Sequence, residues 1–208
     1  VSEPRPEHEA LAPAARAVIR ARQGVELVTS GELRVLDDDL HEVPHDGATL
    51  GEICVRGNVV MAGYWRNPEA TKLAIGDGWM HSGDMGYFDD EGYLFIVDRK
   101  KDMIVSGGFN IFPREVEDVL STHQDVAMVA VVGVPDDKWG EAVTAVVVAK
   151  PGTKPDEREL IELVKTRKGS AHAPKQVKFV PELPMTGVGK IDKKVLRAGF
   201  WAGRDRMV

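Results

Sequence analysis

A lysine on a glycine-rich loop is one candidate for chemistry in this sequence. Lys190 ends the run TGVGK over 186–190, and a compact ammonium group on a long stem can neutralise charge that develops on a carboxylate or a phosphate. The run is not a Walker phosphate-binding loop, because Ile191 follows the lysine where that motif needs Ser or Thr. Taken alone, the pattern is more typical of a solvated surface lysine, so both alternatives stay open.

An aspartate beside a glycine is a second candidate. Asp84 ends the run HSGD over 81–84, between two apolar stretches that are typical of strands. A carboxylate at the end of a strand, next to a glycine, can chelate two adjacent hydroxyl groups such as those of a ribose. The alternative is an aspartate that forms a turn by accepting hydrogen bonds from its own backbone. This motif alone favours the turn.

A charged run followed by glycines marks a joint in the chain. Residues 98–102 (DRKKD) are all charged, and so polar a run resists burial, so we expect an exposed joint between two bodies. A short apolar strand is expected at 103–105, and Ser106, Gly107 and Gly108 follow it. Glycine permits positive φ angles and lets another molecule approach the backbone closely. A joint beside such an approach point is what a hinged enzyme of two bodies needs.

The stretch before the joint is rich in short strand patterns. Glycines separate its apolar runs, a hairpin turn is expected at 90–92, and a helix is expected from Pro68 with Asn67 as its N-cap. Residues 10–22 are alanine-rich and predict another helix. So many short strands predict a small β-barrel-like subdomain over 25–98. The strands expected in it are 26–28, 32–36, 52–55, 59–61, 79–81, 85–88 and 93–97.

The stretch after the joint alternates helix and strand patterns. Its apolar residues recur at helical spacing in some segments and form nearly continuous runs in others. These patterns predict a compact α+β domain over 99–208, with a short open sheet and flanking helices. The whole chain is therefore expected to have an α+β fold, with residues 1–24 as a separate N-terminal segment. The helices expected after the joint are 113–121, 156–167 and 192–198, and the strands are 126–134, 142–149 and 177–180.

Composition argues against several classes of protein. Hydrophobic residues make up 43% and charged residues 29%, which is ordinary for a soluble globular protein. No apolar run approaches the roughly 18 residues of a spanning helix, no signal-peptide pattern appears, and no histidine or cysteine cluster has metal-ligand spacing. The net charge of −6 is uneven, since the chain from Lys165 onward carries eleven Lys/Arg against three Asp/Glu. This basic end suits a small phosphate-bearing ligand or is a solvated tail, and no nucleic-acid-binding motif accompanies it.

The single cysteine and one tryptophan favour packing roles. Cys54 lies in an apolar run, where a buried and inert thiol is the default. Trp139 precedes a buried strand and is expected to pack rather than to stack on a ligand. Because one cysteine cannot form an internal disulfide, a reducing cytoplasm is the expected location.

Five motifs occur in one order, and together they strongly resemble the adenylate-forming superfamily. They are GEICVRG (51–57), MAGYWRNPEAT (61–71), GWMHSGD (78–84), the hinge run over 98–108 and PMTGVGK (184–190). That superfamily contains acyl-CoA synthetases, adenylation domains of peptide synthetases and firefly-type luciferases. The resemblance covers nearly the whole chain, and the chain looks most like a bacterial medium- or long-chain fatty-acid–CoA ligase.

The resemblance implies a role for each matching residue. Asp84 would hold the ribose hydroxyls of ATP and of the adenylate, and Arg99 would contact the same ribose region. Lys101 would stand at the hinge about which the small domain swings, and Lys190 would bridge the carboxylate and the α-phosphate during adenylation. The residues that would line the channel for the pantetheine arm of CoA are Ser106, Gly107 and Gly108.

The implied reaction has two steps. A fatty acid attacks ATP to give acyl-AMP and pyrophosphate, and after the small domain rotates the sulfur of CoA displaces AMP. ATP and CoA are therefore the expected substrates, and Mg²⁺ is expected with ATP, held by ligands outside this chain. The chain departs from the family at Val188, where many members have Ser or Thr, and at 171–172, where many carry an aromatic residue that would contact CoA.

The superfamily's phosphate-binding loop and adenine motif are not among these 208 residues. We therefore expect the C-terminal part of a ligase that is not competent alone and whose partner is an adenylating half. A surface shaped for that partner could also drive homodimer formation. Two alternatives stay open: an acyl-adenylating enzyme that loads the phosphopantetheine of a carrier protein, and a non-catalytic module that binds CoA or a nucleotide.

Overall fold

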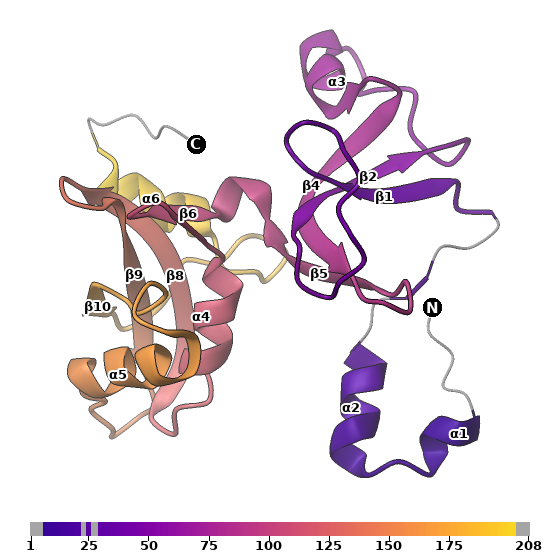
Figure 1. The fold of residues 1–208 in the computed structure, drawn as a ribbon. Helices are drawn as coiled ribbons and strands as arrows, with labels where there is room; N and C mark the ends of the chain where they lie inside the picture. Colours follow the sequence, from indigo (N-terminus) through magenta and orange to yellow (C-terminus); the bar gives the residue numbers. More distant parts are fainter. Residues whose placement is uncertain (1–5, 22–23, 26–28, 203–208) are drawn as a thin grey trace. The chain divides into compact units, whose positions relative to one another are not determined.

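The computed structural model of the chain describes residues 6–21, 24–25 and 29–202, and it divides into two compact units (Figure 1). Unit 1 is Val1–Lys100 and unit 2 is Lys101–Val208. The functional bodies expected at 25–98 and 99–208 stay predictions.

Unit 1 begins with two helices, α1 (Pro6–Glu9) and α2 (Pro13–Ala21). The alanine-rich segment predicted to be helical over 10–22 thus forms a helix that begins at Pro13. Proline suits that first position, because its missing N–H would have no partner within the helix. The strand predicted at 26–28 lies outside the described residues.

The sheet of unit 1 is antiparallel throughout, with the order β1-β2-β4-β3 and with β5 paired to β4. The side chains of Val35, Val43, Ile53 and Phe88 form its apolar core, and a second small cluster contains Cys54 and Trp79. The strands are β1 (Glu32–Leu36), β2 (Gly51–Arg56), β3 (Ile75–Gly76), β4 (Trp79–Phe88) and β5 (Leu94–Arg99).

The helix start predicted at 67–68 and the turn predicted at 90–92 in unit 1 are confirmed, and each is held by a specific hydrogen bond. The helix α3 (Pro68–Ala74) has Asn67 as its N-cap, and the Asn67 side chain accepts a hydrogen bond from the N–H of Ala70 at 3.0 Å. The hairpin between β4 and β5 turns at 90–92, as predicted, where the N–H of Gly92 donates to the carbonyl of Asp89 at 2.9 Å.

One strand prediction in unit 1 is wrong. Residues 59–61 lie outside any strand, because the chain turns at 57–60, where the N–H of Val60 bonds the carbonyl of Gly57 at 3.1 Å and the Val59 side chain is 62% exposed. Three apolar residues in a row resemble a strand in the sequence, but none of these side chains is buried. The separate strands predicted at 79–81 and 85–88 are one continuous strand, β4, which passes through the glycine segment between them.

Unit 2 contains a second five-stranded sheet, in which β9 occupies the centre. The order is β10-β9-β6-β7, and β8 pairs with β9 along ten residue pairs. The strand β10 runs parallel to β9, and the other pairs are antiparallel. The strands are β6 (Ile104–Ser106), β7 (Phe109–Ile111), β8 (Val126–Asp136), β9 (Gly140–Ala149) and β10 (Gln176–Phe179).

Helices cover both faces of the sheet in unit 2 (Figure 1). Along β8, Val129 and Val131 belong to the cluster that packs α4 (Pro113–Leu120) and α5 (Glu157–Lys168), while Ala130 and Val132 belong to the cluster that packs α6 (Lys193–Phe200). Successive strand residues point to opposite faces. A strand with both faces covered therefore needs an uninterrupted apolar run, which is the pattern that the sequence shows.

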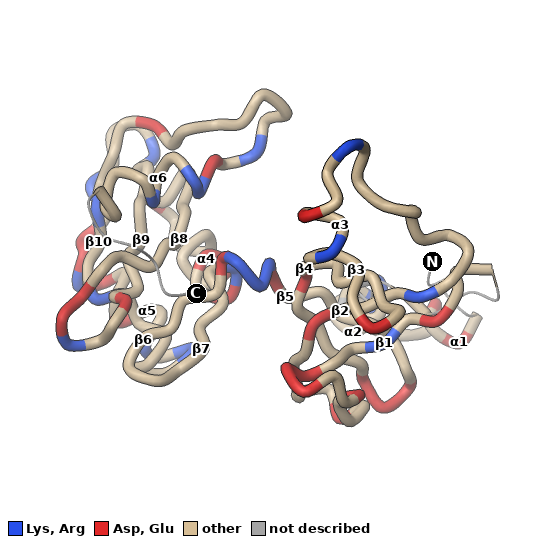
Figure 2. Tube along the Cα trace, turned by 90° about the horizontal axis from the view of Figure 1, so that it is seen from above, with Lys and Arg blue, Asp and Glu red and all other residues tan. Residues whose placement is uncertain are grey.

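The α+β fold class is confirmed: a curled antiparallel sheet with few helices in unit 1, and a small sheet with flanking helices in unit 2. Charge differs between the units. Lys and Arg gather along α6 in unit 2, whereas the loops of unit 1 carry mostly Asp and Glu (Figure 2).

Candidate functional site

Asp84 and Arg99 lie directly opposite each other on β4 and β5, although fourteen residues separate them in the sequence. The Nε of Arg99 lies 2.7 Å from Oδ1 of Asp84, and the two side chains are 54% and 28% exposed. The structure therefore brings together the two residues that the sequence assigns to the ribose. The pair leaves carboxylate oxygen and guanidinium N–H groups accessible to a ligand that carries hydroxyl groups.

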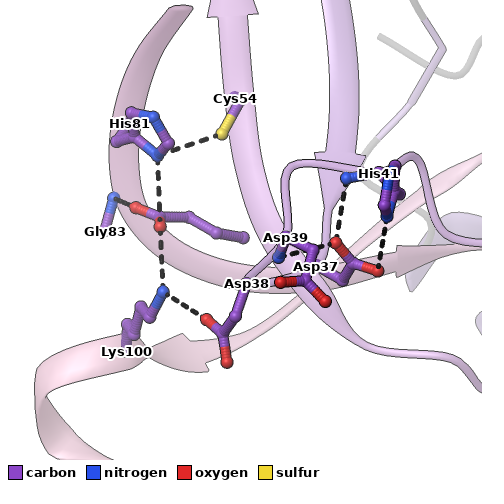
Figure 3. Close-up of polar contacts among 9 residues, drawn as sticks. Asp37, Asp38, Asp39, His41, Cys54, His81, Gly83 and Lys100 are labelled. Carbon is purple, nitrogen blue, oxygen red and sulfur yellow. Dashed lines mark hydrogen bonds and ion pairs between the residues drawn. The ribbon is translucent and has the colours of Figure 1, made fainter. Parts of the chain in front are cut away.

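A carboxylate on the neighbouring strand holds the glycine before Asp84. Oε1 of Glu52 accepts a hydrogen bond from the N–H of Gly83 at 3.1 Å. Oε2 of Glu52 lies 3.3 Å from Nδ1 of His81 and 3.3 Å from Nζ of Lys100 (Figure 3). Lys100 also donates to Asp38 at 3.0 Å. The sequence analysis missed this network, because nothing in the residue spacing links 38, 52 and 100.

Lys100 and Cys54 have shifted pKa values in this network. Burial lowers the pKa of Lys100, but the hydrogen bond to Asp38 and the charge of Glu52 outweigh it, so the net shift is upward. Burial, helped by the charge of Glu52, raises the pKa of the Cys54 thiol to about 11. Cys54 has no exposed surface, so the predicted burial of an unreactive thiol is confirmed.

Cys54, His81 and Glu52 do not form a nucleophile–base–acid relay, although the three side chains meet. The sulfur of Cys54 lies 3.4 Å from Nδ1 of His81, and Glu52 contacts that same nitrogen. A relay needs the two ring nitrogens to face different partners. The cluster is therefore a packing and hydrogen-bonding arrangement within unit 1.

The hinge residue predicted from the resemblance, Lys101, is the first residue of unit 2 and lies in a short 3₁₀ helix, η1 (Lys100–Asp102). Arg197 on α6 donates to the carbonyl of Lys101 at 3.2 Å and pairs with Asp102 at 2.9 Å. The start of unit 2 is thus tied to its last described helix. That Lys101 acts as a hinge stays a prediction.

The glycine segment follows β6 and is held by the loop before β9. The N–H of Gly107 donates to the carbonyl of Trp139 at 2.9 Å, and a β-carbon added to Gly107 would lie 2.7 Å from the indole ring. Trp139 thus packs on Gly107, as predicted, and whether its ring also meets a ligand stays untested. Gly108 differs, since a β-carbon there would meet nothing within 4 Å. One glycine therefore packs under an indole, and the next presents open backbone.

Charged groups surround this segment. The Nζ atoms of Lys138 and Lys175 lie 4.7 and 5.1 Å from the centroid of the Trp139 ring, within the range of cation–π attraction. Burial lowers the pKa of Lys175. Below the segment, the buried carboxylate of Glu141 accepts the N–H of Val105 at 2.9 Å, which fixes β6 against β9. Ser106 is buried as well, at 3% exposure.

Lys190 lies at the end of an exposed loop in unit 2. Its N–H donates to Oγ1 of Thr186 at 3.1 Å, and its carbonyl accepts the N–H of Thr186 at 2.7 Å. These bonds close the loop while the lysine side chain stays exposed. Lys190 therefore belongs to unit 2 and the Asp84–Arg99 pair to unit 1.

Among residues 6–21, 24–25 and 29–202, no group of three or more His, Cys, Asp or Glu side chains could hold a metal ion. In the same described residues, no helix is both long and apolar enough to cross a membrane.

Comparison with known proteins places the chain in a family. Residues 115–190 match the AMP-binding enzyme C-terminal domain. A medium/long-chain-fatty-acid–CoA ligase of Mycobacterium tuberculosis is 52% identical over 177 residues, which are 82% of this chain and 31% of that protein. A long-chain-fatty-acid–CoA ligase of Bacillus subtilis is 49% identical over 146 residues, which are 70% of this chain and 26% of that protein.

Solved structures agree with this match. ATP-bound MatB from Rhodopseudomonas palustris superposes with a TM-score of 0.79 at 37% identity, covering 86% of this chain and 36% of that one. The amide bond synthetase McbA from Marinactinospora thermotolerans gives 0.78 at 41% identity, covering 91% and 39%. The chain belongs to the adenylate-forming superfamily and matches the C-terminal portion of the ligases named above. It spans between a quarter and a third of the length of these two relatives.

Proposed function

We propose that the chain is the C-terminal part of an ATP-dependent carboxylate–CoA ligase. The whole enzyme would convert a fatty acid, ATP and CoA into acyl-CoA, AMP and pyrophosphate through an acyl-AMP intermediate. The observation that carries this proposal is the contact of 2.7 Å between Asp84 and Arg99, two residues from separate motifs that the fold brings into register.

In the adenylation step, an oxygen of the fatty-acid carboxylate attacks the α-phosphorus of ATP, and pyrophosphate leaves. Asp84 would accept hydrogen bonds from the ribose hydroxyls, and Arg99 would hold the Asp84 carboxylate in place beside the ribose. The exposed Lys190 would neutralise charge between the attacking carboxylate and the α-phosphate. Mg²⁺ would accompany ATP, and because the described residues offer no suitable cluster, we expect its ligands on the remaining part of the enzyme.

In the second step, the sulfur of CoA attacks the acyl carbonyl carbon, and AMP leaves. The open backbone at Gly108 and the turn at Gly107 would let the pantetheine arm pass close to unit 2, beside the buried Ser106. Lys138 and Lys175 supply positive charge beside that segment, which suits the phosphate groups of CoA. A swing at Lys101 would exchange Lys190 for the glycine segment between the two steps.

The partner of this chain would be an adenylating segment like that which makes up the rest of its relatives. Three large apolar side chains of unit 1 are strongly exposed, at 62% for Val59, 85% for Trp65 and 84% for Leu73. Exposed apolar side chains of this size suit a protein interface, either with that segment or in a homodimer. We place the enzyme in the cytoplasm, where a single buried thiol needs no oxidising environment.

The experiment that tests the proposal follows AMP release from the enzyme that contains this chain together with its adenylating segment. A panel of fatty acids of increasing chain length is supplied with ATP, with and without CoA. We expect AMP release that requires both a fatty acid and CoA. Release that is indifferent to CoA but rises with a carrier protein would favour the carrier-loading alternative, and no release with any acid would favour a non-catalytic binding module.

A further inference from the structure

Glu52 occupies an irregular place in the sheet of unit 1. The strand β2 pairs with β4 at Glu52 and Met85 and again at Cys54 and His81, and the register shifts between these pairs. Between them, the three residues 82–84 of β4 lie opposite the single residue Ile53 of β2. The segment that carries Asp84 is therefore a bulge, in which regular strand-to-strand hydrogen bonds are interrupted.

The Glu52 side chain replaces a missing backbone partner in this bulge. Gly83 has a φ angle of +72°, so its N–H points out of the regular ladder, and Oε1 of Glu52 accepts it at 3.1 Å. A partly buried N–H without an acceptor would cost free energy. Because Asp84 is the next residue, the orientation of its backbone depends on how Gly83 is held. The N–H of Asp84 is held separately, by Oγ of Ser82 at 3.0 Å.

The second oxygen of Glu52 reaches the end of unit 1. Oε2 lies 3.3 Å from Nζ of Lys100, which is the residue immediately before the predicted hinge at Lys101. Lys100 is also held by Asp38, and Nδ1 of His81 contacts the same Glu52 oxygen (Figure 3). The Glu52 side chain is only 12% exposed, whereas the side chains of Lys100 and Asp38 are 43% and 92% exposed.

We propose that Glu52 is a positioning residue for nucleotide binding: its carboxylate fixes the bulge at Gly83 and so sets the place of the Asp84 carboxylate. The inference rests on the proposed function, because the contact of Asp84 with the ribose is itself proposed. Glu52 touches no reacting atom and acts through Gly83.

The test uses the enzyme that contains this chain with its adenylating segment, and three variants. Glu52→Ala removes all contacts of the carboxylate. Glu52→Gln keeps an oxygen that can accept the Gly83 N–H but loses the charge that pairs with Lys100. Glu32→Ala is the matched control, because Glu32 lies on the adjacent strand β1 and pairs with Arg56 at 2.7 Å and with Arg34 at 3.7 Å, neither of which belongs to the bulge.

Two measurements are made on each variant. Hydrogen exchange followed by mass spectrometry on peptides over 79–88 reports how well the Gly83 N–H is held, and calorimetry gives the affinity for ATP whether or not catalysis occurs. For Glu52→Ala we expect exchange at least about tenfold faster and an ATP affinity about tenfold weaker, as for a lost charged hydrogen bond. The maximal adenylation rate should change less than about threefold. In Glu52→Gln, the exchange rate and the ATP affinity should both lie close to the wild-type values. In Glu32→Ala, both should equal the wild-type values.

The outcomes separate this inference from the proposed function. If wild-type enzyme does not bind ATP, the proposed function fails and the inference falls with it. If wild type binds ATP but Glu52→Ala binds it equally well, the inference alone is overturned. An equal loss in Glu52→Gln and Glu52→Ala would also overturn it, since the retained acceptor would then be irrelevant. Should Glu52→Ala fail to fold, Glu52→Gln against Glu32→Ala still decides, because a tenfold affinity loss in the amide variant contradicts the inference.

Discussion

Hydrogen bonds hold the main chain of Lys190, while the residue remains exposed. The bonds between Lys190 and Thr186 close the loop at both the N–H and the carbonyl, and the residue is exposed. A lysine whose main chain is fixed and whose ammonium is accessible can meet a substrate without reorganising the loop.

Replacing Lys190 with alanine should separate the two half-reactions. We expect Lys190→Ala to slow acyl-AMP formation by roughly 10²–10³-fold, as for loss of one group that stabilises developing charge. Thioester formation from supplied acyl-AMP should change less than about threefold, because the lysine is proposed to act in the first step only. Single-turnover assays of each step measure this.

The matched control is Lys194→Ala, which removes an exposed lysine from the nearby helix α6. It should leave both half-reactions at the wild-type rate. A Lys190→Ala enzyme that forms acyl-AMP normally would show that the role implied by the resemblance does not hold for this chain.

Cys54 should be protected from alkylation in the folded chain. Its side chain is fully buried and its pKa is raised to about 11, so at pH 8 only about one thiol in a thousand would be ionised. We expect no iodoacetamide adduct in native protein over an hour at pH 8 and complete labelling in 8 M urea, read by intact-mass spectrometry. Stoichiometric labelling of the native chain would contradict the buried position.

The elements that could be predicted from sequence are those whose burial has a simple period. The apolar run at 126–134 predicts β8 because both of its faces are covered, and α4 follows from apolar residues at 116, 119 and 120, which are all buried. The run at 59–61 misleads because none of its three side chains is fully buried and Val59 is 62% exposed. Periodicity reports what a segment could bury, and only tertiary contacts decide whether it does.

The candidate site was predictable only where residues form contiguous motifs. Asp84, Arg99 and Lys190 each stand inside a recognisable run. The contribution of Glu52 was not predictable, because its partners Gly83 and Lys100 are 31 and 48 residues away in the sequence. A bulge that interrupts a ladder has no sequence period, so the group that satisfies it becomes visible only in the fold.

The two glycines after β6 should respond differently to the same substitution. Both have positive φ angles, +58° at Gly107 and +82° at Gly108, so alanine at either position costs about 1–2 kcal/mol of backbone strain. Gly107→Ala also drives a β-carbon to 2.7 Å from the Trp139 ring. We expect it to lower the free energy of unfolding by about 1–3 kcal/mol more than Gly108→Ala, as measured by urea titration.

A double variant checks the cause of that difference. Adding Trp139→Ala to Gly107→Ala removes the ring that the new methyl group meets. In the double-mutant cycle, the additional decrease in the free energy of unfolding caused by Gly107→Ala should therefore largely disappear. The cycle should show no coupling between Trp139→Ala and Gly108→Ala. Equal destabilisation by the two glycine variants would contradict the packing of Trp139 on Gly107.

At the scale of the whole molecule, the proposed roles are divided between the two units. Asp84 and Arg99 belong to unit 1, and Ser106, Gly107, Gly108 and Lys190 belong to unit 2. A two-step reaction can use such a division, because moving one unit changes which group faces the nucleotide without altering either fold. The boundary between Lys100 and Lys101 falls in the charged run that the sequence marks as a joint.

The 208-residue chain by itself should form no acyl-AMP. Its sequence contains the residues proposed to contact the ribose and Lys190 but no Ser/Thr/Gly-rich phosphate-binding loop. The triphosphate would therefore have no binding loop, and charge in the transition state would be poorly stabilised. We expect acyl-AMP synthesis below detection for this chain, by chromatography of reactions with radiolabelled ATP. Joining it to an adenylating segment should restore synthesis, and the Asp84→Ala form of the joined enzyme should bind ATP more weakly. Acyl-AMP formed by the isolated chain would show that its own residues suffice, and the division of labour proposed here would then be wrong.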